Sequence, residues 1–209
     1  MENRVTNEVL CQMCQGEVQT GSAVADLCIS NLGQLDGRCC KRRDNASDVV
    51  DIIGLDLSNC SLRHLEDLHD ASMAILIDIS LNPLSNLSDS VFLGFYNLAN
   101  LTLPSNLQCP GSDDAWEKVE VKGDLRFCEG QKSACNQTGQ MSWDCPENSL
   151  CTPYGPGFFE CNCVDNFHGY KCLREGQFPT LKVFGILGGS TVFVSALLWV
   201  TQRRKVKAI

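Results

Sequence analysis

Residues 52–62 read I-I-G-L-D-L-S-N-C-S-L and fit the spacing L-x-x-L-x-L-x-x-N/C-x-L at every defined position. The spacing returns at residues 74–84 (A-I-L-I-D-I-S-L-N-P-L), weakly only at Ala74, and at residues 98–108 (L-A-N-L-T-L-P-S-N-L-Q), except at Gln108. The three matches begin 22 and then 24 residues apart. Matches that recur at a nearly fixed period indicate a repeating structural unit.

That period lies within the range of leucine-rich repeats, so we expect three leucine-rich-repeat-like turns over residues 47–108. Each turn would contribute one short strand, and the apolar side chains of successive strands would stack. The strands are expected around Leu55–Leu57, Ile77–Ile79 and Leu101–Leu103. Asn82 and Asn106 would bond the backbone of adjacent turns, at a position where Cys60 is an accepted substitute. Three unrelated strands of a small β-domain are the alternative.

The residues that point outward from these strands are expected to line the concave face of the repeats. They include Asp56, Asp78 and Thr102. Two stacked carboxylates would suit a basic partner, although a plain solvated acidic face explains the same residues. Asn100 lies on this face and begins the sequon N-L-T, so a glycan there would partly obstruct it.

The chain holds 14 cysteines in 209 residues, and none follows Cys172. Such a content predicts disulfides and an oxidising compartment. Cysteine-rich segments at residues 1–46 and 109–132 flank the repeats and are expected to cap their apolar ends. Cys11 and Cys14 form a C-x-x-C pair, the spacing of thiol–disulfide exchange motifs, but no thioredoxin-like βαβ pattern surrounds it.

The sequence leaves the pairing of the cysteines in the caps and repeats open. There are eight of them: Cys11, Cys14, Cys28, Cys39, Cys40, Cys60, Cys109 and Cys128. If Cys60 is a buried free thiol within the repeats, seven remain, and one of these must be free or pair between chains.

The six remaining cysteines occupy positions 135, 145, 151, 161, 163 and 172. The last three stand in C-N-C-V-D-N-F-H-G-Y-K-C, a spacing that resembles the EGF-like module, here over residues 133–174. Cysteine arithmetic alone allows fifteen pairings. The resemblance implies Cys135–Cys151, Cys145–Cys161 and Cys163–Cys172. A module of about forty residues needs such links because it buries too little apolar surface to fold without them.

Residues 183–201 read V-F-G-I-L-G-G-S-T-V-F-V-S-A-L-L-W-V-T and contain no charge. As a helix they span about 28 Å, close to the roughly 30 Å hydrocarbon core of a bilayer. The tail at residues 202–209 is basic, which predicts a cytoplasmic tail and a lumenal or extracellular location for residues 1–182. No apolar run opens the chain, so either a natural start with a signal peptide lies upstream of Met1, or the membrane helix itself drives insertion. We expect a truncated or alternative N-terminus, because the second route would have to carry about 180 residues backwards through the translocon.

Two short motifs accompany the predicted membrane helix. Gly185 and Gly189 form G-x-x-x-G, which lets a second helix approach closely and predicts either a homodimer or contact with a membrane partner. The alternative is that glycine is simply frequent in membrane spans. Lys205 and Lys207 stand at positions −5 and −3 from the C-terminus, as in a dilysine signal for retrieval to the endoplasmic reticulum, or they belong to a plain stop-transfer cluster.

The formal net charge of −8 argues against nucleic acid as a partner, because phosphate binding needs clustered lysine and arginine. Only three histidines occur, far apart in sequence, so we expect no catalytic cluster, no metal site and no cofactor. Calcium is further disfavoured because no acidic or amide cluster precedes the first cysteine of the EGF-like segment. Five sequons predict a glycoprotein: Asn45, Asn59, Asn86, Asn100 and Asn136.

Taken in order, the runs G-L-D-L-S-N-C-S-L, C-P-E-N-S-L-C, F-H-G-Y-K-C, F-G-I-L-G and L-L-W-V-T-Q-R-R-K resemble the all-trans retinoic acid-induced differentiation factor (apoptosis-related protein 3) family. The resemblance implies a non-enzymatic, single-pass membrane glycoprotein that promotes osteoblast differentiation and restrains proliferation. It implies two possible partners, a lysosomal solute carrier that the chain would serve as an accessory subunit and a secreted EGF-repeat, Nel-like ligand. The expected location is the lysosomal, endoplasmic reticulum or cell membrane.

Overall fold

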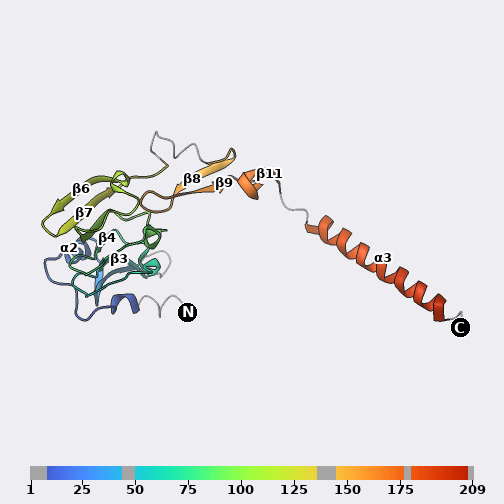
Figure 1. Ribbon diagram of the computed structural model, residues 1–209, viewed down its shortest axis with the longest axis horizontal. Coiled ribbons are helices and arrows are strands. Elements are labelled where there is room, and N and C mark those ends of the chain that lie inside the picture. Colours follow the sequence, from blue (N-terminus) through green and yellow to red (C-terminus); the bar gives the residue numbers. More distant parts are fainter. Residues whose placement is uncertain (1–8, 44–49, 136–144, 177–179, 207–209) are drawn as a thin grey trace.

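The computed structural model describes residues 9–43, 50–135, 145–176 and 180–206, and shows a β-rich chain with a helix at its C-terminal end (Figure 1). The first part contains α2 (Ala23–Ser30), β1 (Gln34–Asp36), β2 (Cys39–Arg43), β3 (Val50–Asp56), β4 (Leu76–Asp78), β5 (Asn100–Pro104), β6 (Trp116–Lys122) and β7 (Leu125–Gln131). The second part contains β8 (Ser149–Pro153), β9 (Phe159–Cys163), β10 (Phe167–His168), β11 (Arg174–Glu175) and α3 (Thr180–Val206). Short 3-10 turns lie at His69–Ala71, Asp89–Phe92, Asp113–Ala115 and Tyr170–Cys172.

Seven strands form one sheet in the order β1-β2-β3-β4-β5-β7-β6. Its centre is parallel, because β3, β4 and β5 run in the same direction with Leu55, Ile77 and Leu101 in register. The strands at both ends of the sheet are antiparallel to their neighbours. Each of the three parallel strands overlaps a segment in which the sequence spacing places a strand.

The main apolar core lies behind the three parallel strands. Leu55, Ile77 and Leu101 are at most 1% exposed and belong to one cluster of buried side chains. Phe92 and Phe95, from the coils that return to the sheet, join this cluster, and their rings meet edge to face with centroids 5.7 Å apart. Removing a side chain of this size from water stabilises the fold by roughly 1.5–3 kcal/mol. The apolar positions of the repeated spacing are therefore the ones that hold the sheet together.

The helix α2 lies on the face of the sheet opposite to this core. Ser22 caps α2 by accepting a hydrogen bond from the Ala25 N–H (3.2 Å). The buried side chains of α2 then form a second, smaller cluster with Ile53 and Leu76. A disulfide between Cys28 and Cys40 fastens the helix to β2. α2 therefore covers part of the face that the repeat spacing predicts to be exposed.

Residues 145–176 form two small antiparallel hairpins, β8–β9 and β10–β11. Three disulfides hold them: Cys135–Cys151, Cys145–Cys161 and Cys163–Cys172. These are the three pairs that the EGF-like resemblance implies. The sulfur links replace an apolar core, since most side chains of this segment are exposed or only partly buried.

The turn between β8 and β9 packs against the larger sheet's returning coils. The Gly94 N–H donates a hydrogen bond to the Tyr154 carbonyl oxygen (2.9 Å), and Gly155 and Pro156 are buried at this contact. Gly111 lies against Pro156 so closely that a Cβ added to Gly111 would overlap the Pro156 carbonyl. The hairpin turn is therefore seated on the rest of the chain by backbone-to-backbone contact, which only glycine permits.

α3 is the one helix, among the residues described, that is long and apolar enough to cross a membrane, over Thr180–Arg203. It therefore extends beyond the predicted span of residues 183–201 at both ends. The Arg203 guanidinium lies over the Trp199 ring, 4.0 Å from its centroid. A cation and an indole one turn apart at the end of an apolar helix suit the interface between hydrocarbon and water.

Candidate interaction face

We call the outward side of β3, β4 and β5 the outward face. Asp56, Asp78 and Thr102 lie side by side on it, as the register of the strands requires. Asp56, however, is only 2% exposed, and its Oδ2 lies 3.4 Å from Nη1 of Arg38. The prediction of two solvent-facing carboxylates is therefore wrong for Asp56, because a cap residue already neutralises it. Asp78 is the carboxylate that remains partly exposed.

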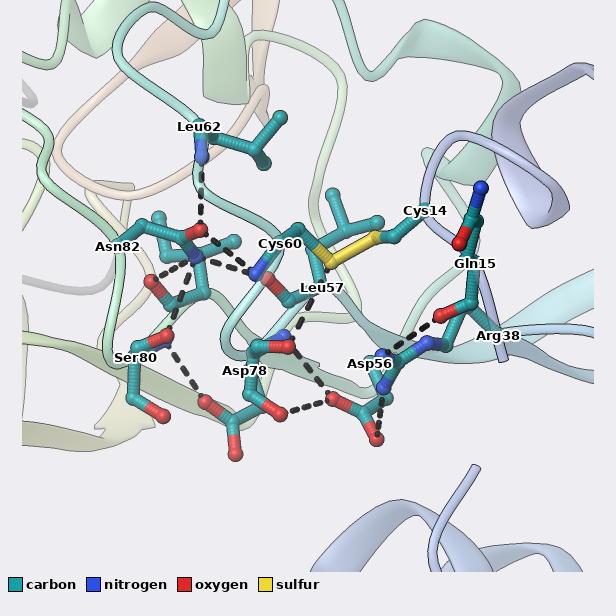
Figure 2. Close-up of a disulfide and its surroundings, with 12 residues drawn as sticks. Cys14, Gln15, Arg38, Asp56, Leu57, Cys60, Leu62, Asp78, Ser80 and Asn82 are labelled. Carbon is teal, nitrogen blue, oxygen red and sulfur yellow. Dashed lines mark hydrogen bonds and ion pairs between the residues drawn. A yellow bond between two sulfur atoms is a disulfide. The ribbon is translucent and has the colours of Figure 1, made fainter. Parts of the chain in front are cut away.

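Arg38 comes from the turn between β1 and β2, and Figure 2 shows it between the N-terminal segment and the parallel strands. Its Nη2 donates to the Gln15 carbonyl oxygen (3.2 Å), and its backbone oxygen accepts from the Asp56 N–H (2.9 Å). The other oxygen of Asp56 accepts hydrogen bonds from the N–H and the hydroxyl of Ser58. Breaking so buried a pair leaves an uncompensated charge, so Arg38 and Asp56 are structural rather than partner-binding.

Asp78 has a different environment. Its Oδ1 accepts a hydrogen bond from the Ser80 N–H (2.9 Å). Partial burial raises the pKa of the Asp78 carboxyl above its ordinary value, and the nearby charge of Asp56 raises it further, while the bonds from Ser80 work in the opposite direction. Asp78 thus presents a carboxylate that is more readily protonated than a surface aspartate.

α2 closes the neighbouring part of the outward face. Gly54 occupies the next row of β3, and a Cβ there would come 3.2 Å from Val24 and 3.1 Å from Leu27, both of α2. Leu76, the partner of Gly54 on β4, is 9% exposed. The repeat spacing predicts that the outward side chains of the strands line an exposed face. It does not predict α2, because nothing in it indicates that the cap folds back over the strands. Asn100, in the same row on β5, remains exposed.

Asn82 joins two successive coils of the chain from a buried position (Figure 2). Its Oδ1 accepts hydrogen bonds from the Cys60 and Leu62 N–H groups (both 3.0 Å). Its Nδ2 donates to the Leu57 and Ile79 carbonyl oxygens (both 2.8 Å). Asn106 acts in the same way but with one bond, from Nδ2 to the Leu84 carbonyl oxygen (3.0 Å).

Cys60 is not a free thiol. It forms a disulfide with Cys14, and Figure 2 shows this bond above the Asp56 and Asp78 row. All 14 cysteines are paired, the remaining links being Cys11–Cys39, Cys28–Cys40 and Cys109–Cys128. The odd count inferred from a free Cys60 therefore disappears. Cys11 and Cys14 also bond to different partners, so their C-x-x-C spacing does not form the internal disulfide of an exchange motif.

A shallow groove of about 360 Å³ lies at the start of the parallel strands, beside the outward face. Six residues line it: Arg42, Asp51, Ile53, Met73, Ile75 and Asn97. Its lining combines apolar side chains such as Ile53 and Ile75 with one side chain of each charge, Arg42 and Asp51. Among the residues that the structure describes, no three histidine, cysteine or acidic side chains lie together as a metal site.

Comparison with known proteins decides the family. A family model described as "ATRAID-like, EGF domain" matches residues 145–174, and one described as "ATRAID C-terminal domain" matches residues 180–205. The "All-trans retinoic acid-induced differentiation factor" of Danio rerio is 61% identical over 202 residues, which cover 97% of this chain and 87% of the relative. The proteins of the same name in Homo sapiens and Mus musculus are 44% and 43% identical, over 95% of this chain and 85% and 87% of theirs.

The chain belongs to the all-trans retinoic acid-induced differentiation factor family. No solved structure matches it significantly. The two family models fall on the hairpins β8–β11 and on α3. In this family member, the EGF-like domain is therefore the segment whose β8–β9 turn packs against the coils of the larger sheet. It lies immediately before the candidate membrane helix.

The predicted glycosylation, helix-packing and retrieval residues of this family member lie partly inside and partly outside the described residues. Asn59, Asn86 and Asn100 are exposed, as acceptor asparagines must be, whereas Asn45 and Asn136 lie outside the described residues. Gly185 and Gly189 lie on α3 with no other group within 4 Å of where a Cβ would stand. Lys205 belongs to α3, and Lys207 lies outside the described residues.

Proposed function

We propose that the chain is a non-enzymatic, single-pass membrane glycoprotein that promotes cell differentiation by binding a protein partner on the lumenal or extracellular side. The observation that carries this proposal is the order of the parts: seven disulfides, an EGF-like domain, an apolar helix and a basic tail. Disulfides persist in oxidising compartments, which supports a lumenal or extracellular location for the cysteine-rich part of the chain. Basic residues remain on the cytoplasmic side, which supports a cytoplasmic location for the C-terminal tail.

We further propose that residues 47–108 are three leucine-rich-repeat turns. The parallel pairing of β3, β4 and β5 supports this assignment, as does the bonding of Asn82 to the preceding coil. In such solenoids the exposed side of the strands is the binding surface. Asp56 is bound to Arg38, and α2 covers part of the same face. The part of the binding surface that stays at least partly exposed is therefore the region around Asp78, Thr102 and Asn100.

The proposed cellular role is promotion of osteoblast differentiation with restraint of proliferation. Two partners fit it. In the first version the chain is a receptor at the cell surface. Its leucine-rich repeats or its EGF-like domain would bind a secreted EGF-repeat, Nel-like ligand. A lysosomal solute carrier would instead bind this chain as an accessory subunit, and the G-x-x-x-G face and the lysine-rich tail favour this version because a multi-pass partner offers helices within the membrane.

The deciding experiment is affinity capture of the full chain from detergent-solubilised membranes, with mass-spectrometric identification of partners. Two variants separate the versions. Gly185→Leu with Gly189→Leu should weaken capture of a multi-pass partner, or of a second copy of the chain, about tenfold, which is roughly 1–2 kcal/mol of helix association. Thr191→Leu is the matched control, because Thr191 lies on another side of α3.

The outcome assigns the partner to one surface. Loss of a multi-pass partner only in the double glycine variant supports the accessory subunit. Capture of a secreted EGF-repeat protein that is unaffected by the glycine variant but lost in Asp78→Lys supports the receptor. Recovery of neither class would contradict the proposed function.

A further inference from the structure

The sequon at Asn59 lies in an unusual turn. Asn59, Cys60 and Ser61 form N-x-S shortly after β3, which ends at Asp56. The backbone φ angles of Asn59 and Ser61 are +53° and +55°, in the left-handed region that few residues other than glycine adopt. The acceptor and the hydroxyl residue of this sequon are therefore held in a conformation that an unfolded chain seldom visits.

Hydrogen bonds fix this turn to the next coil of the chain. The Asn59 N–H donates to the Ser80 carbonyl oxygen (3.0 Å), and the Cys60 and Leu62 N–H groups donate to Oδ1 of Asn82 (both 3.0 Å). Figure 2 shows Cys60 and Leu62 converging on Asn82. Asn82 is buried, so these bonds cannot be exchanged for water without unpacking the coil.

The middle residue of the sequon carries a covalent lock as well. Cys60 is bonded to Cys14, which lies 46 residues nearer the N-terminus. Cys14 therefore enters the lumen before Asn59 does, and its thiol is available when Cys60 arrives. Both cysteines are partly exposed in the folded chain, unlike the buried cysteines of the neighbouring disulfides Cys11–Cys39 and Cys28–Cys40.

A second sequon offers the contrast. Asn86 is exposed and lies in a coil between β4 and β5. Among the hydrogen bonds of the described residues, none comes from the backbone N–H of Asn86 or Leu87. No cysteine stands within this sequon, which reads N-L-S. Ser88, the hydroxyl residue of this sequon, accepts a hydrogen bond from the Ser90 N–H (3.3 Å) at the start of the turn Asp89–Phe92. In the described contacts, however, no disulfide and no buried side chain holds the backbone of the Asn86 sequon, so it is held less tightly than the Asn59 sequon.

We propose that N-glycosylation of Asn59 competes with closure of the Cys14–Cys60 disulfide, so that the disulfide sets how much of the chain carries a glycan at Asn59. A transferase has to enclose the asparagine amide and the hydroxyl two residues later. Once Cys60 is bonded and Asn82 has engaged its N–H, the turn can no longer be drawn out into that site. The inference rests on the proposed lumenal placement of residues 1–182.

The two competing steps are chemically independent. In the first, the amide nitrogen of Asn59 forms a bond to the anomeric carbon of an oligosaccharide carried on a lipid pyrophosphate. The bond from that carbon to the pyrophosphate oxygen breaks, the lipid pyrophosphate leaves with the electron pair, and the amide gives up one proton. In the second, the Cys14 and Cys60 thiols give up two protons and two electrons to the disulfide of an exchange protein, which becomes a dithiol.

The test is site-by-site glycan occupancy of the full chain, made in mammalian cells behind a signal sequence. Glycans are released by peptide glycosidase in ¹⁸O-labelled water, and each former acceptor asparagine is read by mass spectrometry. In the unmodified chain Asn59 should be occupied clearly less than Asn86. Cys14→Ser with Cys60→Ser keeps the N-x-S pattern and leaves no unpaired thiol, and it should raise Asn59 occupancy at least twofold without changing Asn86.

The matched control is Cys28→Ser with Cys40→Ser, which removes a disulfide from the same cap without touching the sequon. It should leave Asn59 occupancy low. Equal occupancy of Asn59 and Asn86 in the unmodified chain, no change in the first variant, or an equal rise in the control would each overturn the inference. Absence of glycan at Asn86 as well would overturn the lumenal placement, which is a separate failure.

Discussion

The parallel strands β3–β5 and the hairpins β8–β11 follow one another in the same chain but are held together by different means. The strands are stabilised by a continuous layer of buried side chains such as Leu55, Ile77 and Leu101. In residues 145–176 only Gly155, Pro156 and Cys172 are buried. Two of these three form the turn that packs on the larger sheet, and the third is a disulfide cysteine.

This difference shows what each region needs in order to stay folded. The strands derive their stability from the hydrophobic effect and from polar groups that join successive coils. The hairpins bury too little apolar surface to be stabilised in this way. They depend instead on their disulfides and on the packing of the β8–β9 turn against the rest of the chain. Changes in the strands should therefore act through packing and hydrogen bonds, and changes in the hairpins through links and contact.

The sharpest test of this difference is removal of the last disulfide, with Cys163→Ser and Cys172→Ser together. Such a loss should cost on the order of 2–5 kcal/mol, enough to unfold β10–β11. Hydrogen exchange followed by mass spectrometry should then show fast exchange in residues 163–176, while β3–β5 keep their protection. Loss of protection in β3–β5 would show that the two regions share one cooperative unit.

The next largest effect is expected within the strands, for Asn82→Ala. This change leaves the Cys60 and Leu62 N–H groups and the Leu57 carbonyl without their partner, at a cost of about 3 kcal/mol in the free energy of unfolding. Asn106→Ala is the control, because Asn106 donates a single bond and should cost about 1 kcal/mol. Chemical denaturation followed by circular dichroism measures both. Equal losses would mean that the additional hydrogen bonds of Asn82 add nothing beyond the effect of a single bond.

The sequence predicts the strands better than it predicts the face they present. The positions of β3, β4 and β5 and the bonding role of Asn82 follow from a local spacing, because stacked coils put equivalent residues in register. The pairing of Arg38 with Asp56 and of Cys14 with Cys60 does not follow from it. These contacts join segments far apart in sequence, and no periodicity records which cap residue meets which strand.

The same reason explains why the contact between the EGF-like β8–β9 turn and the larger sheet could not be predicted. The cysteine spacing determines the links inside the hairpins, but it says nothing of what the turn at Gly155 touches. The only sequence signal is a concentration of glycine and proline in residues 153–157, which also describes an ordinary exposed turn. Close backbone approach is decided by tertiary structure, so it needs coordinates.

A third prediction concerns that contact. Gly111→Ala places a methyl group against the Pro156 carbonyl and should cost roughly 1–3 kcal/mol beyond the effect of its left-handed backbone. Gly123→Ala is the matched control, since Gly123 also has a positive φ (+60°) but no atom within 4 Å of a Cβ. Limited proteolysis should cut Gly111→Ala faster within residues 145–176 than it cuts Gly123→Ala. Identical cleavage of the two variants would mean that the contact between Gly111 and Pro156 does not stabilise the hairpins.

The smallest expected effect comes from the partly buried carboxyl on the outward face. Burial raises the pKa of Asp78, so the folded chain holds its proton to a higher pH than the unfolded chain does. The resulting stability is full below the unfolded pKa, near 3.8, and is lost as the pH rises through the folded pKa. Asp78→Asn abolishes this loss while keeping an oxygen for the Ser80 N–H. Because the change creates the sequon N-I-S at residues 78–80, all chains in this comparison are made in cells whose N-glycosylation is blocked. We therefore expect a small increase in the melting temperature at pH 7 and none at pH 3.

The control for Asp78→Asn is Asp165→Asn, which removes one negative charge from an exposed position in the hairpins. It should leave the melting temperature nearly unchanged at both pH values, because an exposed carboxylate gives up little hydration on folding. Differential scanning calorimetry of the two variants beside the unmodified chain measures the effect. A lower melting temperature for Asp78→Asn at pH 7 would mean that the bonds from Ser80 stabilise the carboxylate by more than burial destabilises it. The outward face would then tolerate a charge at Asp78 as readily as the hairpins tolerate one at Asp165.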